Sequence, residues 1–239
     1  LHSDVNIAIE GKDILSIGDV PKGFQPARVI DGRDFVAIPA FFNCHTHAAM
    51  TLERGWAEDL PFDRWLNEKI WLAESAMERE DVYWGAALAC CEMIRSGTVG
   101  FADHYFYMDQ VAKAVSEAGM KATLAWCQFG IGKEQEVGGV ILEDTLSFIR
   151  EWHGAGEGKI RCVLGPHSPY MCPPEFLRRV VECAGELNTG IHLHLSESEE
   201  QVKNSISAYK KTPVEHLSHL GVFDRYCIAA HCITVRDED

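Results

Sequence analysis

The chain carries two histidines separated by one residue, His45 and His47, just after the apolar run 35–42. Side chains at positions i and i+2 of a strand point to the same face, so both imidazoles can reach one point at the carboxyl end of a buried strand. Such a pair can bind a metal ion, or it can be no more than two polar residues on a strand. The other strand ends of the chain decide between these two interpretations.

Histidines recur at the ends of three later apolar segments, a position shared by His167, His194 and His231. Glu197 lies just beyond His194, where a carboxylate can stand over a bound metal ion or, alternatively, stabilise the start of a helix. His192 shares a strand face with His194 one layer deeper, so we interpret it as a hydrogen-bonded core histidine. His104 is ambiguous, and we expect the four histidines outside strand ends on the surface: His2, His153, His216 and His219.

The elements that must position these residues alternate between strands and helices. Near-continuous apolar runs are typical of strands buried on both faces, and they predict strands at 35–42, 98–103, 121–127, 160–164, 190–195 and 226–231. Apolar residues at helical spacing predict helices at 62–76, 82–95 and 174–187. Thr212 and Glu215 form the signature of a capping box in front of a further short helix.

This alternation predicts an α/β fold with a parallel sheet and right-handed crossovers. Periodicity does not separate an open sheet from a closed barrel, but histidines at several strand ends can converge only where those ends share one mouth, as in a (β/α)8 TIM-type barrel. We expect residues 39–239 to form such a barrel with about six βα units, lacking its last strands; the family resemblance given below implies that it is a metal-dependent hydrolase. Alternating residues at 5–9 and 14–17 around a turn predict a hairpin in a partial β subdomain at 1–38.

Composition limits the classes of partner. The 239 residues are 46% hydrophobic and 24% charged, as in ordinary globular proteins, and the formal net charge is -14. This charge argues against nucleic acid and membrane as partners, and no apolar run approaches the roughly 20 residues that span a bilayer. Nine cysteines without CxxC spacing are interpreted as reduced, mostly core residues of a cytoplasmic protein. We expect a small-molecule substrate and leave a homo-oligomer open.

Several motifs stand in the order shown by one known family: 39–47 (PAFFNCHTH), 50–55 (MTLERG), 57–60 (AEDL) with 65–66 (WL), 165–170 (GPHSPY), 192–197 (HLHLSE) and 230–232 (AHC). They resemble the amidohydrolase superfamily, and within it the branch of methylthioadenosine/S-adenosylhomocysteine deaminases and related chlorohydrolases. The resemblance covers nearly the whole chain. It implies an aminohydrolase acting on C–N bonds other than peptide bonds, with an adenosine-type nucleoside as substrate and ammonia as a product.

The resemblance also implies residue roles. It assigns one divalent ion, usually zinc and sometimes iron, to three ligands: His45, His47 and His194. It makes two residues catalytic. Glu197 would be the proton shuttle, and His231 would hydrogen-bond the reacting water. It gives three substrate-binding candidates. Glu74 would bind the ribose hydroxyls, His167 would contact the base, and Trp65 is the third candidate.

Two departures from the family pattern matter. The superfamily carries an aspartate at the end of strand eight, and nothing here matches it, so we expect a fragment of a longer protein. Residues 126–140 offer no arginine for a homocysteine carboxylate, which favours a neutral 5′-modified adenosine. Two alternatives stay open: a chlorohydrolase or cyclic amidohydrolase that uses the same water, and an inactive barrel fragment that serves as a binding module.

Overall fold

The computed structural model describes residues 2–130 and 140–239 and divides into two compact units, Leu1–Pro39 and Ala40–Asp239. In the first unit, β1 (Asn6–Glu10) and β2 (Asp13–Gly18) pair antiparallel, which confirms the predicted hairpin. Its turn contains Gly11 at a φ of 59°, a left-handed conformation that glycine adopts without steric cost.

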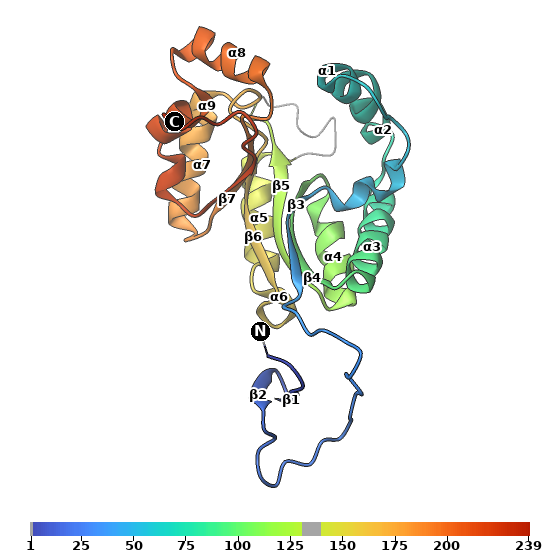
Figure 1. Ribbon diagram of the computed structural model, residues 1–239. Helices are drawn as coiled ribbons and strands as arrows, with labels where there is room; N and C mark the ends of the chain where they lie inside the picture. The colour runs from blue at the N-terminus through green and yellow to red at the C-terminus, as the bar shows by residue number, and fades with distance from the viewer. Residues whose placement is uncertain (1, 131–139) are drawn as a thin grey trace. The chain divides into compact units, whose positions relative to one another are not determined.

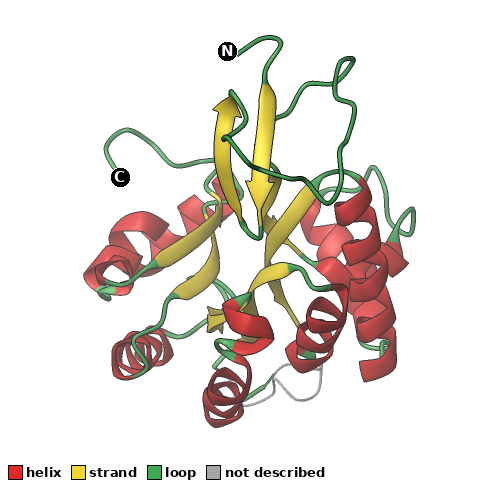
Figure 2. Cartoon of the chain, turned by 90° about the horizontal axis from the view of Figure 1, so that it is seen from below, coloured by secondary structure: helices red, strands yellow, loops and turns green. Residues whose placement is uncertain are grey.

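The second unit contains one sheet of six parallel strands in sequence order: β3 (Phe41–Thr46), β4 (Thr98–Tyr105), β5 (Lys121–Gln128), β6 (Ile160–Pro166), β7 (Ile191–Leu195) and β8 (Cys227–His231). Helices surround the strands (Figures 1 and 2). β3 and β8 are not hydrogen-bonded to each other, yet the ring centroids of His45 and His231 lie only 5.1 Å apart. The sheet therefore curls into a nearly closed, incomplete TIM-type barrel, which confirms the predicted fold class.

The helical elements are η1 (Ala48–Glu53), α1 (Phe62–Trp65), the π-helical turn η2 (Leu66–Ile70), α2 (Trp71–Glu74), α3 (Arg79–Arg95), α4 (Met108–Ala118), α5 (Leu142–Trp152), α6 (Ala155–Gly158), α7 (Pro174–Glu186), α8 (Glu199–Tyr209), α9 (Pro213–His219) and η4 (Val222–Asp224). The single helix predicted at 62–76 is thus interrupted by a π turn. The capping box is present at α9, where Glu215 N–H donates to Thr212 Oγ1 at 3.2 Å and Thr212 N–H donates to Glu215 Oε2 at 2.8 Å. Within the described residues, every helix is too short or too polar to cross a bilayer.

The strand predicted at 35–42 is wrong over most of its length. The strand begins at Phe41, which pairs with Thr98, and residues 35–40 pair with no strand in the described part of the chain. Phe35 and Val36 are 77% and 80% exposed. An apolar run forms a strand only beside a partner strand, and Pro39 has no N–H to donate to one. The shift places His45 inside the strand and His47 just after it.

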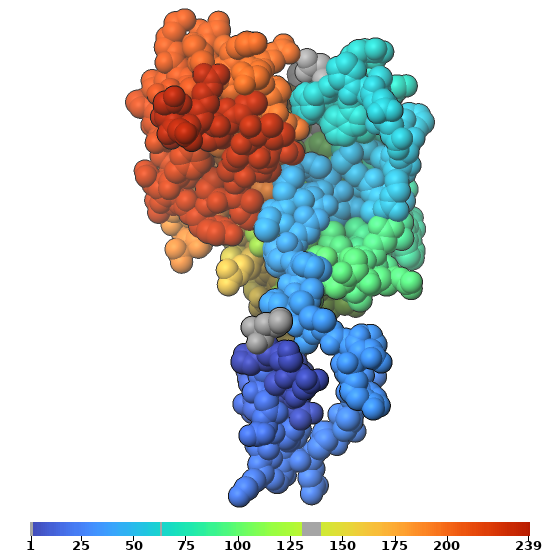
Figure 3. All heavy atoms as spheres, in the orientation of Figure 1, coloured from blue at the N-terminus to red at the C-terminus, as the bar shows by residue number. Residues whose placement is uncertain are grey.

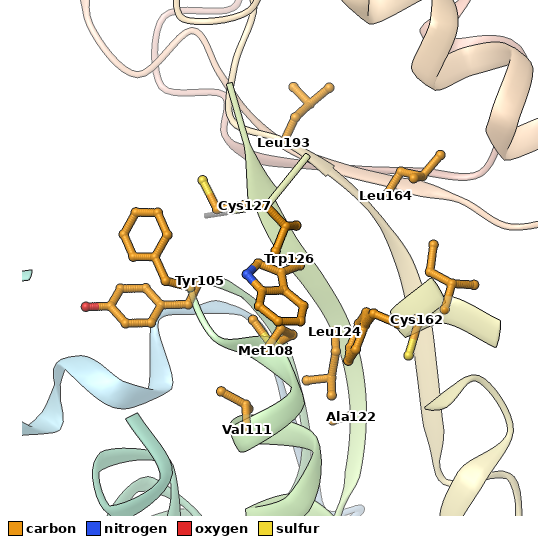
Figure 4. Packing of buried hydrophobic residues seen from close by; sticks show 14 of the residues in the cluster. Tyr105, Met108, Val111, Ala122, Leu124, Trp126, Cys127, Cys162, Leu164 and Leu193 are labelled. Atoms are coloured by element: carbon orange, nitrogen blue, oxygen red, sulfur yellow. The ribbon is translucent and has the colours of Figure 1, made fainter. Parts of the chain in front are cut away.

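Buried side chains from β4, β5, β6, β7 and the helices outside them form the core (Figure 4). Phe101, Leu124 and Leu164 are fully buried, as expected for parallel strands covered on both faces. Burial of each such side chain contributes about 1.5–3 kcal/mol. This packing fixes the strand ends on which the histidines stand.

Two expectations about burial are wrong. His216, expected on the surface, is 5% exposed and its ring stacks on Tyr209 at 4.0 Å between centroids, because α9 turns that face inward. Cys91, expected in the core, is exposed on α3. All nine cysteines lie in the described residues, and none of them forms a disulfide bond there.

Candidate metal centre and active site

Three histidines from two distant segments meet at the carboxyl ends of the strands. His45 comes from β3, His47 directly follows it, and His194 comes from β7. One ring nitrogen from each lies within 4.8 Å of the other two. The structure thus brings together the three residues that the sequence proposed as metal ligands.

Backbone carbonyls set the orientation of two of these rings. Nδ1 of His47 lies 2.5 Å from the carbonyl oxygen of His104, and Nδ1 of His194 lies 2.8 Å from that of His167. A carbonyl oxygen can only accept, so each Nδ1 carries the proton and donates it. Each Nε2 is left with its lone pair, the form in which imidazole binds a metal ion.

The third ring is oriented by another histidine. Nδ1 of His45 lies 2.9 Å from Nε2 of His192, which is fully buried, as the sequence suggested. Nε2 of His45 is buried and has no hydrogen-bond partner among the described residues. An unpaired buried polar atom is costly unless a ligand completes it.

Burial keeps the histidine trio (His45, His47 and His194) neutral. It lowers the pKa of His45 to about 3 and that of His47 to about 4, and the charge of neighbouring imidazoles lowers the first further. Burial also holds the pKa of His194 well below its usual value. Three neutral imidazole nitrogens within 4.8 Å of one another form a donor set that suits a single divalent ion such as zinc.

Glu197 and His231 form a pair beside the trio. Oε1 of Glu197 lies 3.6 Å from Nε2 of His231. The ring of His231 stacks on that of His194, with centroids 5.4 Å apart. Burial raises the pKa of the Glu197 carboxyl, against the lowering effect of His231 and of a hydrogen bond from Gln201. A carboxyl with a raised pKa accepts a proton more readily than an ordinary carboxylate and can return it to a second group.

A pocket of about 290 Å³ opens above this group. Its walls include the three candidate substrate contacts, Trp65, Glu74 and His167, together with Glu197. In Figure 3 the residues of α1 and α2 (cyan) and those of α8 (orange) lie on the two sides of the upper part of the second unit. Residues 62–74 and the strand ends thus enclose a space near the lower end of the usual range for small-molecule sites.

Burial favours the protonated form of Glu74 in this pocket. Burial raises its pKa to about 8, against a hydrogen bond with Tyr105 and with a further contribution from the charge of Glu53. Glu53 itself has both carboxyl oxygens buried without hydrogen-bond partners in the described residues, and burial raises its pKa to about 7. A protonated carboxyl offers a donor as well as an acceptor.

Strand β4 contributes two buried residues near the site, and the sequence patterns did not identify either of them as a site residue. His104, left ambiguous, is 1% exposed, lines the pocket, and its Nε2 lies 3.2 Å from the carbonyl oxygen of Gly165. Asp103 is fully buried and accepts the N–H of Ala48 at 3.0 Å, which fixes the turn directly after His47. Burial raises the pKa of Asp103 to about 7. Its position at a strand end was the available signal.

The chain is similar to several known proteins. The 5-methylthioadenosine/S-adenosylhomocysteine deaminase of Pelotomaculum thermopropionicum is 47% identical over 242 residues, which cover 100% of this chain and 55% of that protein. An adenosine deaminase from Xanthomonas campestris with bound zinc superimposes with a TM-score of 0.76 at 31% identity, over 84% of this chain and 46% of that one. The chain spans about half the length of the curated relatives it matches.

The fold recurs at lower identity. Guanine deaminase from C. acetobutylicum, with bound guanine in its active site, superimposes with a TM-score of 0.88 at 19% identity, over 98% of this chain and 59% of that one. At this identity the likeness concerns the fold alone. The sequence model of the amidohydrolase family matches residues 36–239, which hold the whole histidine cluster. With the motifs and the geometry, this match establishes that the chain belongs to the amidohydrolase family.

Proposed function

We propose that the protein hydrolytically deaminates an adenosine-type nucleoside, with a divalent metal ion held by His45, His47 and His194. The observation that carries this proposal is the convergence of the three neutral imidazoles beside the Glu197–His231 pair, at the floor of a pocket. The matched relatives named as deaminases support the choice of reaction.

Zinc is the proposed ion, since three nitrogen donors suit it and the Xanthomonas campestris relative binds it. When bound, such an ion supplies a Lewis acid and makes water a nucleophile near neutral pH. Iron(II) accepts the same donors, so metal analysis is part of the test.

Side chains of the protein would carry out the proton transfers. Glu197 takes a proton from the attacking water and delivers it to the heterocycle and the leaving amine, a contribution of roughly 10² to 10⁴ in rate. His231 is held within 3.6 Å of that carboxyl and orients the water by hydrogen bonding. The products are the oxo heterocycle and ammonia.

The pocket walls would bind the nucleoside. Neutral Glu74 can donate to one ribose hydroxyl and accept from the other. Trp65 offers an aromatic face. His167 contacts the base; its ring is held by stacking on Phe129 at 5.3 Å and by Ser168 Oγ, 3.0 Å from its Nδ1. A neutral 5′ substituent is proposed.

Metal content and ammonia release test the proposal together. The purified intact protein should hold about one divalent ion per chain and should release ammonia from 5′-modified adenosines. His45→Ala should lose both, while His219→Ala, outside the site, should keep both. Chloride release from chlorinated triazines without ammonia release would instead identify a chlorohydrolase, and a metal-free folded protein would refute the proposal.

A further inference from the structure

Glu197 stands on backbone that leaves its strand abruptly. β7 ends at Leu195, and Ser196 has a φ of 49°, in the left-handed region that side-chain-bearing residues rarely adopt. Such a conformation is strained and persists only where surrounding groups determine it. The direction of the Glu197 side chain therefore depends on what holds the peptide bond between Ser196 and Glu197.

Both polar atoms of this peptide bond are held by partners from other elements. The carbonyl oxygen of Ser196 accepts two hydrogen bonds from Thr234, one from its N–H and one from its Oγ1, each 2.9 Å long. The N–H of Glu197 donates to Oε1 of Gln201, also at 2.9 Å. Thr234 follows β8 and Gln201 lies in the first turn of α8, so two separate segments grip one peptide group.

The two partners are themselves fixed. Gln201 is 8% exposed, and its N–H donates to Oγ of Ser198, the N-cap of α8, at 3.3 Å. Thr234 comes three residues after His231. The N–H of Cys232, between them, donates to the carbonyl oxygen of Leu195 at 2.9 Å. One short segment thus carries His231 and also holds the backbone of Glu197.

We propose that Gln201 and Thr234 are positioning residues that set the carboxyl of Glu197 against His231 and the histidine trio. The inference rests on the proposed function, in which Glu197 transfers the proton. Neither residue lines the pocket itself. The Gln201 side chain also hydrogen-bonds to Tyr170 in the pocket wall and to the Glu197 carboxyl, so Thr234 gives the cleaner test of positioning through the backbone. A displacement of a proton-transfer group by about 1 Å can cost about 100-fold in rate.

Thr234→Val removes the hydroxyl donor and keeps the branched shape, and Gln201→Met removes the acceptor at similar length. Each should lower kcat by about 10- to 100-fold, with KM and metal content within about twofold of the parent, because the orientation of the proton-transfer group changes and the binding groups do not. Thr234→Ser restores the donor and should recover most of kcat. Thr145→Val is the matched control, because the Thr145 hydroxyl is buried in α5 without a hydrogen-bond partner in the described residues.

Hydrogen exchange gives a readout that is independent of turnover. In Gln201→Met the Glu197 amide loses its acceptor and should exchange about fivefold faster, which corresponds to one lost hydrogen bond of about 1 kcal/mol. Unchanged exchange of Glu197 in Gln201→Met, unchanged kcat in both variants, or a kcat loss accompanied by metal loss would overturn the inference. Absence of ammonia release from the parent itself would refute the proposed function, and the exchange comparison would still decide whether the peptide is held as described.

Discussion

Glu197→Gln is the substitution that tests the proposed chemistry most directly. The amide has nearly the shape of the carboxyl but cannot accept a proton and return it. Glu197 is not one of the three histidine ligands, so the substitution leaves the proposed metal donors intact. Because burial raises the pKa of this carboxyl, a neutral amide at the same place removes a burial cost and should not destabilise the fold.

The expected loss follows from the role of the group. A positioned proton-transfer residue contributes about 10² to 10⁴ in rate, which equals about 2.7–5.4 kcal/mol of activation free energy. In the proposed mechanism His231, 3.6 Å away, still orients the water, but it does not carry out the proton transfer to the heterocycle and the leaving amine that is assigned to Glu197. We therefore expect kcat to fall at least about 100-fold.

The assay compares parent, Glu197→Gln and Glu200→Gln as intact metal-loaded proteins, by ammonia release and by elemental analysis. Glu200 is exposed three residues further along the chain, so its variant makes the same charge change outside the site. The expected result is a large loss of kcat for Glu197→Gln alone, with equal metal content in all three. A Glu197→Gln protein that turns over at nearly the parent rate would remove Glu197 from the mechanism.

Three further predictions concern the metal site and the fold. His192→Phe deprives Nδ1 of His45 of its partner, and should weaken metal binding about 10- to 100-fold in a chelator competition; unchanged affinity would contradict the orienting role. The metal-free protein should lose stability as pH falls. In the folded chain the pKa values of His45 and His47 are lowered from 6.5 to about 3 and 4, so the unfolded chain takes up protons first as the pH falls. Each histidine should therefore lower the free energy of unfolding by about 1 kcal/mol between about pH 6.5 and 5.5, measured by urea unfolding. A flat profile over that range would show that these imidazoles stay accessible. Leu124→Ala should cost about 2–5 kcal/mol, against about 0.5 kcal/mol or less for the 45%-exposed Val99→Ala; equal losses would show that β5 is not part of the core.

Residue type and spacing were enough to predict the fold class and the meeting of the histidines. Strand periodicity puts His45 and His47 on one face, and a parallel barrel brings His194 to the same mouth. These rules depend on alternation and on chain direction, which survive small errors in strand limits. The wrong prediction at 35–42 shows that an apolar run alone does not establish a strand. A strand also needs a neighbouring strand to pair with, and the local sequence does not show whether one is present.

The groups that orient the site were beyond prediction for a different reason. The carbonyl oxygens of His104 and His167 fix two of the rings, and every residue carries such an oxygen. Only the register between neighbouring strands decides which one faces an imidazole. Thr234 and Gln201 are equally ordinary residue types, and their contacts cross between β8, β7 and α8.

The protonation of the pocket follows from burial and could not be read from residue identity. At neutral pH the histidine trio is uncharged and Glu74 is protonated, because desolvation outweighs the hydrogen bond that would favour its ionised form. In a neutral imidazole the nitrogen that would bind the metal ion is already unprotonated, so binding does not compete with titration of these rings near pH 7. A divalent ion held by these imidazoles would act as a Lewis acid, and the proposed proton acceptor, Glu197, lies in the same pocket beside His231.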